Sequence, residues 1–175
     1  AAGILGALNI EVNDRRIEVF NEKEPVYQAD LMINRHFDGT SVFDIVVETD
    51  KPEALFNPVY LRKMEALQRK IETFAPVGGT TSVVDYLKQM NRSLNEGKPE
   101  EYRLVDDAEL NAQLFFLYST SGDPTDFEEE IDYDYQRANI RVNMKGPSHQ
   151  EVAPVVEGIQ KYILEEFNEP GLKAT

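Results

Sequence analysis

The chain has 175 residues, with 18 Lys and Arg against 32 Asp and Glu, so its formal net charge is −14. Such a charge repels nucleic-acid phosphates and anionic lipid headgroups, which argues against binding to either. Because the chain has no cysteine, disulfides, thiolate metal sites, iron–sulfur clusters and cysteine nucleophiles are excluded. A hydrophobic fraction of 41% supports one packed domain, or one domain with a sizeable insertion.

The N-terminal region begins with the longest apolar run of the chain, residues 1–8. This run is too short to cross a membrane and lacks the basic start of a signal peptide. It is either an ordinary apolar N-terminus or the remnant of a longer apolar segment. From Asn9 to Phe20, partial alternation of apolar and polar residues predicts a strand, broken at Asn13-Asp14.

Three elements follow in the first half of the chain. Pro25 opens a helix that Asp38-Gly39 stops. Its apolar stripe consists of Val26, Ala29, Ile33 and Phe37. The stretch 40–49 is rich in β-branched residues and nearly continuously apolar, which predicts a central strand. An amphipathic helix is predicted over 59–74, with an Asn-Pro N-cap pair before it.

The second half contains further helices and strands. In chain order they are a turn over 76–79, a short strand over 80–83, a helix starting at Ser82 or Asp85, a helix after Asp106-Asp107, a strand over 135–144, a helix after Gly146-Pro147-Ser148, and a strand starting at Leu172. Two strand–helix–strand units separated by helices predict an α+β fold. We expect a ferredoxin-like arrangement, a mixed sheet with helices on one face, with a helical insertion at about 84–130.

Clustered acids are the first candidate for chemistry. The run from Asp126 to Asp134 could bind Ca²⁺, or it could be a solvated helix end and turn. It lacks the Asp-x-Asp-x-Asp-Gly pattern of an EF-hand loop, which favours the second interpretation. With 32 acids in the chain, the sequence singles out no catalytic carboxylate pair, so a hydrolase stays an open alternative.

A glycine pair and two histidines are weaker candidates. Gly78-Gly79 before a helix could cradle a phosphate, but no P-loop Lys follows, which favours a plain turn. His36 and His149 are isolated, and both fit structural positions at helix ends better than a metal site.

The aromatic and methionine stripes could line an apolar ligand groove, although such residues more often lie in a core. Their members are Phe115, Phe116, Tyr118, Met64 and Met90. Phe115 and Phe116 are adjacent, so one helix cannot direct both toward the same core. One of them should meet another layer, a partner or a ligand. The residues alone assign no catalytic, cofactor-binding or metal-binding position, and no cofactor is expected.

Several short segments together match the pattern of one known family. They are Phe20, Pro25–Asp30, Ile33-Asn34, His36–Thr40, Asn57-Pro58, Leu61–Lys63, Leu67-Gln68, Ser82–Lys88, Met90-Asn91 and Asp132–Tyr135. These segments resemble the extracytoplasmic loop domains of resistance–nodulation–division (RND) exporters, and the nearest branch is the hydrophobe/amphiphile efflux type, related to the mycobacterial membrane protein large exporters. The resemblance covers roughly residues 10–167, and Asp38 departs from it because the family more often has Gly there.

The resemblance implies a ferredoxin-like porter domain with helical insertions, held outside the bacterial or archaeal cytoplasmic membrane between two membrane helices. The parent protein would export hydrophobic or amphiphilic molecules, often lipids, with the proton gradient. The family's proton-relay acids lie in membrane helices, so none is carried over. Residues 1–8 would then be the end of an excised membrane helix, 9–171 the porter-like domain, and 172–175 a strand cut short.

The implied partners are the membrane domain of the same polypeptide, a hydrophobic or amphiphilic substrate, and further copies of the chain. Of the two equivalent exporter loops, the second is favoured by the first of these segments, which lie between Phe20 and Thr40. On this interpretation the chain is a binding and conduit module rather than an enzyme. A free-standing α+β domain that binds or senses a small ligand is the alternative.

Overall fold

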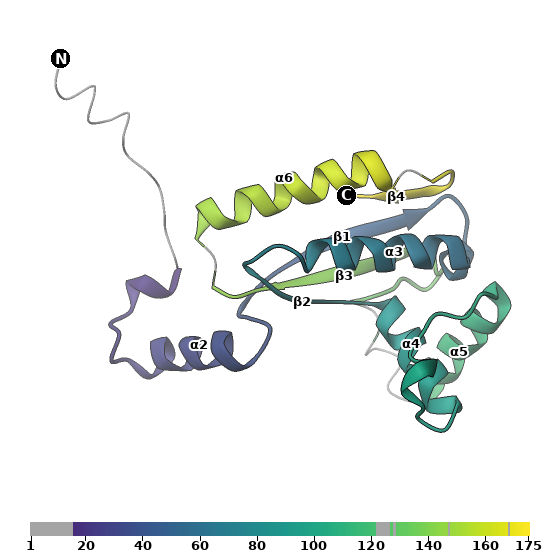
Figure 1. Cartoon of the computed structure of the whole chain (residues 1–175), viewed down its shortest axis with the longest axis horizontal. Coiled ribbons are helices and arrows are strands. Elements are labelled where there is room, and N and C mark those ends of the chain that lie inside the picture. Colours follow the sequence, from purple (N-terminus) through teal and green to yellow (C-terminus); the bar gives the residue numbers. More distant parts are fainter. Residues whose placement is uncertain (1–15, 122–126, 128, 147, 168) are drawn as a thin grey trace, which may run out of the picture.

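Four strands form an antiparallel sheet in the order β2-β3-β1-β4 (Figure 1). They are β1 (Ser41–Thr49), β2 (Val77–Ser82), β3 (Arg137–Met144) and β4 (Leu172–Ala174). The computed structural model describes residues 16–121, 127, 129–146, 148–167 and 169–175. The α+β, ferredoxin-like prediction is confirmed. The sheet is antiparallel rather than mixed, because each strand–helix–strand unit leaves room for one strand of the other unit.

Helices α3 (Pro58–Ile71) and α6 (His149–Glu166) are the two crossovers, and they lie on one face of the sheet (Figure 1). The burial of β3 alternates strictly, with its even-numbered residues buried toward these helices. The amphipathic helix predicted over 59–74, with an apolar stripe of Leu61, Met64, Leu67, Ile71 and Phe74, is confirmed as far as Ile71, where the helix ends. Leu61, Met64, Leu67 and Ile71 are all fully buried in the core, whereas Phe74 follows the helix and is partly buried.

Local capping signals set the starts of two helices as predicted. The Asn57 side chain accepts the Val59 N–H at 2.9 Å and caps α3. Ser82 caps α4 (Val83–Leu94), and Asp85 completes the capping box by accepting the Ser82 N–H at 3.0 Å. Of the two starts that the sequence left open, the structure therefore selects Ser82.

The glycine pair lies inside strand β2, so the predicted turn over 76–79 is wrong for these residues. The pairing of β2 with β3 shifts register between Val77 and Gly79. A Cβ on Gly78 would overlap the backbone carbonyl of Asp38, and one on Gly79 would lie 3.1 Å from the Asp38 carboxylate. The glycines thus allow the turn at Asp38 to pack directly on the strand.

The chain between β2 and β3 carries α4, the short 3₁₀ helix η3 (Pro99–Glu101) and α5 (Ala108–Ser121). An aromatic cluster joins these helices to the body, with ring centroids 4.9–5.9 Å apart. Its members are Phe56, Tyr86, Phe115, Tyr118, Phe127 and Tyr135. Phe56 comes from the 3₁₀ helix η2 (Ala54–Phe56), directly before α3.

The N-terminal part differs most from expectation. Residues Arg16–Val19 form the 3₁₀ helix η1, so the strand predicted over 9–20 is wrong there, and its residues 9–15 lie outside the described range. Alternation of apolar and polar residues produces a strand only where a partner strand lies alongside. In this segment the backbone bonds locally, because the Phe20 N–H donates to the Ile17 carbonyl at 3.1 Å.

Helix α2 (Pro25–His36) forms as predicted, but none of its residues is buried. It extends away from the sheet (Figure 1). The predicted stripe is therefore exposed, with Phe37 at 66%. Helical periodicity is a local property, whereas burial depends on what the fold places opposite the stripe.

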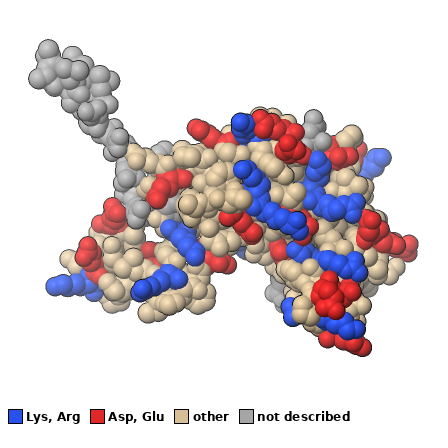
Figure 2. Space-filling view, in the orientation of Figure 1, with Lys and Arg blue, Asp and Glu red and all other residues tan. Residues whose placement is uncertain are grey.

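Within the described residues, no helix combines the length and the apolar character needed to cross a bilayer. On the face seen in Figure 2, acidic and basic side chains are intermingled over the body. The acidic excess is therefore not gathered into one patch on that face.

Candidate functional site

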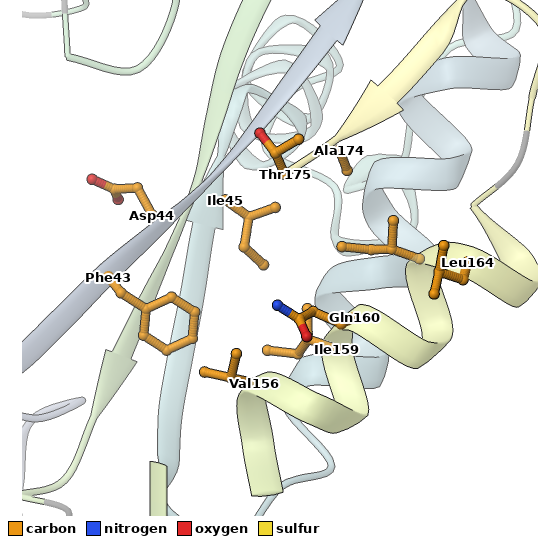
Figure 3. Close-up of a pocket in the computed structure, with 10 residues that line it drawn as sticks. Phe43, Asp44, Ile45, Val156, Ile159, Gln160, Leu164, Ala174 and Thr175 are labelled. Carbon is orange, nitrogen blue, oxygen red and sulfur yellow. The ribbon is translucent and has the colours of Figure 1, made fainter. Parts of the chain in front are cut away.

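A groove of about 500 Å³ lies between strand β1, the end of β4 and helix α6 (Figure 3). Its walls come from two distant parts of the sequence. They are formed by Phe43, Asp44, Ile45, Val156, Ile159, Gln160, Ile163, Leu164, Ala174 and Thr175.

Regular secondary structure positions the groove's apolar side chains. Ile45 belongs to the buried face of β1, and Phe43, two residues earlier, points the same way and is half-buried. On α6, Ile159 and Ile163 are one turn apart and face the sheet. The Glu151 carboxylate accepts the Ser148 N–H at 2.8 Å and fixes the start of this helix.

Polar groups are few in the groove. Gln160 extends its amide into the groove, whereas the Asp44 carboxylate lies on the other side of β1 (Figure 3). There Asp44 pairs with Arg141, at 3.4 Å between Oδ1 and Nε. Among the described lining residues, Asp44 is the one ionisable side chain. The groove is therefore suited to hydrocarbon rather than to acid–base chemistry.

Three of the described acids of the run 126–134 are engaged by other groups, and Asp126 and Glu128 lie outside the described residues. The Asp132 carboxylate accepts the N–H groups of Gln136 and Arg137 at 2.8 and 2.9 Å. Arg141 pairs with Glu129 at 3.3 Å and with Glu130 at 3.6 Å. These contacts, led by the Glu129 hydrogen bond, raise the pKa of Arg141. In the described part of the chain, no three His, Asp or Glu side chains are placed to hold a metal ion.

The phosphate interpretation of the glycine pair finds no support in the geometry. The N-terminus of α4 that follows is already occupied, because the Ser82 hydroxyl accepts the Val84 N–H at 3.1 Å. That hydroxyl also donates to Gln68 at 2.9 Å. His36 is exposed in the last turn of α2, and His149 is the first residue of α6.

The adjacent phenylalanines of α5 divide as predicted. Phe115 is buried within the aromatic cluster, whereas Phe116 is 64% exposed. Met64 lies in the core, Met90 and Tyr118 pack against it, and none of the three lines the groove. The sequence did not reveal the groove, because its walls come from segments more than 100 residues apart that carry ordinary core residues.

A polar cluster links α3 to α4 away from the groove. Lys88 bonds Glu65 at 2.8 Å and lies 4.6 Å from the centre of the Tyr102 ring. Arg69 also pairs with Glu65, at 2.9 Å. Burial alone would raise the pKa of the Glu65 carboxyl, but Lys88 and Arg69 together lower it below the ordinary value of 4.5.

The Glu65 cluster predicts a pH-dependent contribution to stability. Because the folded-state pKa is depressed, the contribution is present above pH 4.5 and is lost as the pH falls below that value. The Glu65→Gln variant should therefore differ most from the wild type in free energy of unfolding at pH 7, and the difference should shrink toward pH 3. Urea titrations at several pH values measure this. Glu96→Gln, at an 80% exposed side chain, is the control. A Glu65→Gln difference that does not change with pH contradicts the prediction.

Comparisons with known proteins do not assign the chain to a family. No protein-family model matches the sequence, and no curated protein matches it either.

Proposed function

We propose that this chain is the extracytoplasmic porter domain of an RND-type exporter and that its groove holds hydrophobic or amphiphilic molecules. The observation that carries the proposal is the groove itself, in which seven of the ten lining residues are aliphatic or aromatic. The phrases that resemble the exporter loops support it, as does the position of α4 and α5 between the two halves of the ferredoxin-like core. The membrane part of the same polypeptide would supply the driving force.

In this proposal the groove forms part of the wall of a path along which the hydrophobic or amphiphilic substrate moves. The sheet and its two covering helices form a rigid body, since α3, α6 and the sheet share one core. Movement of that body against a neighbouring domain or copy would open and close access to the groove. A free-standing ligand-binding or sensing domain would use the same groove, so gene structure separates the two functions.

The intact gene tests the exporter assignment. We expect a reading frame that encodes hydrophobic membrane-spanning segments on both sides of this region. A reading frame that carries this domain without any such segments would contradict the exporter and favour the free-standing binding domain.

A groove variant tests ligand binding directly. Ile163→Glu places a charge in the apolar wall, so affinity for the neutral probe N-phenyl-1-naphthylamine should fall about tenfold or more. Leu94→Glu is the matched control, because Leu94 is 58% exposed on α4 and does not line the groove. Probe fluorescence measures affinity, and circular dichroism checks that both variants fold. Equal affinity of the two variants contradicts binding in this groove.

A further inference from the structure

The sulfur of this chain is held entirely by methionine side chains, because the sequence contains no cysteine. The four methionines are Met32, Met64, Met90 and Met144, and all of them lie within the described residues. A peroxide oxidises the thioether sulfur of Met to a sulfoxide, which a reductase can convert back to the thioether. Methionine is therefore the residue type through which a peroxide can modify this chain reversibly.

Exposure to solvent divides the four methionines. Met64 is 0% exposed and Met144 is 1% exposed, while Met90 packs against the core and is partly buried. Met32, in contrast, is 63% exposed on α2. Because a peroxide must reach the sulfur atom, oxidation follows exposure. Met32 is the methionine that a peroxide reaches without any opening of the fold.

The attachment of α2 explains why Met32 is exposed. The half-buried side chains of α2 are Tyr27, Asp30 and Asn34, which form one polar row at spacings of three and four residues. The Asn34 amide donates to the Thr40 hydroxyl at 3.0 Å, so this row faces the turn that leads into β1. Helix α2 extends away from the sheet (Figure 1). Met32 lies outside the polar row, so the attachment of the helix leaves its sulfur in solvent.

The oxidised product also suits the position of Met32 better than it suits the core. A sulfoxide is polar, so at Met64 or Met144 its oxygen would be buried among apolar side chains, which costs free energy. At Met32 water can solvate it. Arg35 and His36 follow Met32 by three and four residues and are its neighbours on the helix surface, where their N–H groups can donate to the sulfoxide oxygen.

We infer that Met32 is a reversible oxidation site whose co-reactant is a hydroperoxide. The sulfur lone pair attacks one oxygen of the peroxide, the O–O bond breaks and an S–O bond forms. Sulfur loses two electrons and the peroxide is reduced, leaving as water from hydrogen peroxide or as the alcohol from an organic hydroperoxide. The sulfoxide makes α2 more polar between the exposed Leu31 and Ile33. Since Met32 does not line the groove, the inference stands apart from the proposed function.

Trypsin places each methionine in a peptide of its own, which makes the inference directly measurable. The four peptides cover residues 24–35, 64–69, 89–92 and 142–145. The folded full chain is treated with hydrogen peroxide, digested and analysed by mass spectrometry. We expect the 24–35 peptide to gain one oxygen atom about tenfold faster than each of the other three. In urea the four rates should become similar, which removes intrinsic reactivity as the cause of the difference.

Two leucine variants are matched controls for the assignment. Met32→Leu should abolish the fast oxidation, whereas Met90→Leu should leave it unchanged. A methionine sulfoxide reductase with a thiol reductant should return the oxidised wild type to its original mass. Oxidation of Met32 should not change the midpoint of urea unfolding, because no residue of α2 is buried.

Three results would overturn the inference. The first is oxidation of Met64, Met90 or Met144 in the folded chain at the rate of Met32. The second is a rate for Met32 that is much lower in the folded chain than in urea, which would show that its sulfur is covered in solution. The third is a sulfoxide that the reductase cannot reduce, which would overturn reversibility. The affinity of the groove for its naphthylamine probe is measured separately, so none of these results decides the proposed function.

Discussion

Replacing Leu67 with Ala should lower the free energy of unfolding by about 3 kcal/mol. Leu67 lies in the middle of α3 with no exposed surface, between the sheet and the other helices of the core. The truncation removes buried methyl groups and leaves a cavity that the packed neighbours fill only in part. Urea denaturation followed by circular dichroism measures the loss.

Leu94→Ala is the matched control for this truncation, since Leu94 is 58% exposed at the end of α4. We expect it to change the free energy of unfolding by less than about 0.5 kcal/mol. Equal losses for the two variants would show that the α3 stripe does not form the centre of the core.

Gly78→Ala should cost about 3 kcal/mol, although it adds only one methyl group. That methyl would overlap the backbone carbonyl of Asp38, which cannot rotate away as a side chain could. Either β2 or the turn after α2 must move. We therefore also expect faster hydrogen exchange in α2, because this turn joins α2 to the sheet.

Gly97→Ala is the comparison for the glycine prediction. Gly97 has a φ of +72° but nothing lies within 4 Å of the position of a Cβ. Its substitution should cost about 1 kcal/mol through backbone strain alone. A Gly78→Ala variant as stable as Gly97→Ala would contradict the close packing of Asp38 on β2.

The features predicted correctly from the sequence were those set by residues close to one another along the chain. The Asn57 and Ser82 caps were predictable because the side chain that bonds the helix N-terminus lies within three residues of its target. Strand β1 was predictable because a buried central strand needs a nearly continuous apolar run. The order of two strand–helix–strand units then led to the ferredoxin-like arrangement.

Features that depend on distant neighbours were not predictable. The glycine pair predicts a turn from the sequence but lies in β2, because the need for glycine arises from Asp38, forty residues away in sequence. The exposure of the α2 stripe depends on what the fold places beside it. The groove escaped prediction for a similar reason, since Ile45 and Ile159 look like ordinary core residues until the sheet brings them together.

The strand order has a consequence for the rate of folding. The central pairing of β1 with β3 joins Asp44 to Arg141, which are 97 residues apart, and the pairing of β2 with β3 must close a loop that contains α4 and α5. Loop-closure entropy rises only with the logarithm of loop length, so the insertion weakens the native state little. The rate is affected more strongly, because these long-range contacts must form before they contribute stability. We therefore expect slow folding for a domain of this size, with α4 forming early from its own capping box and shortening the loop that remains to be closed.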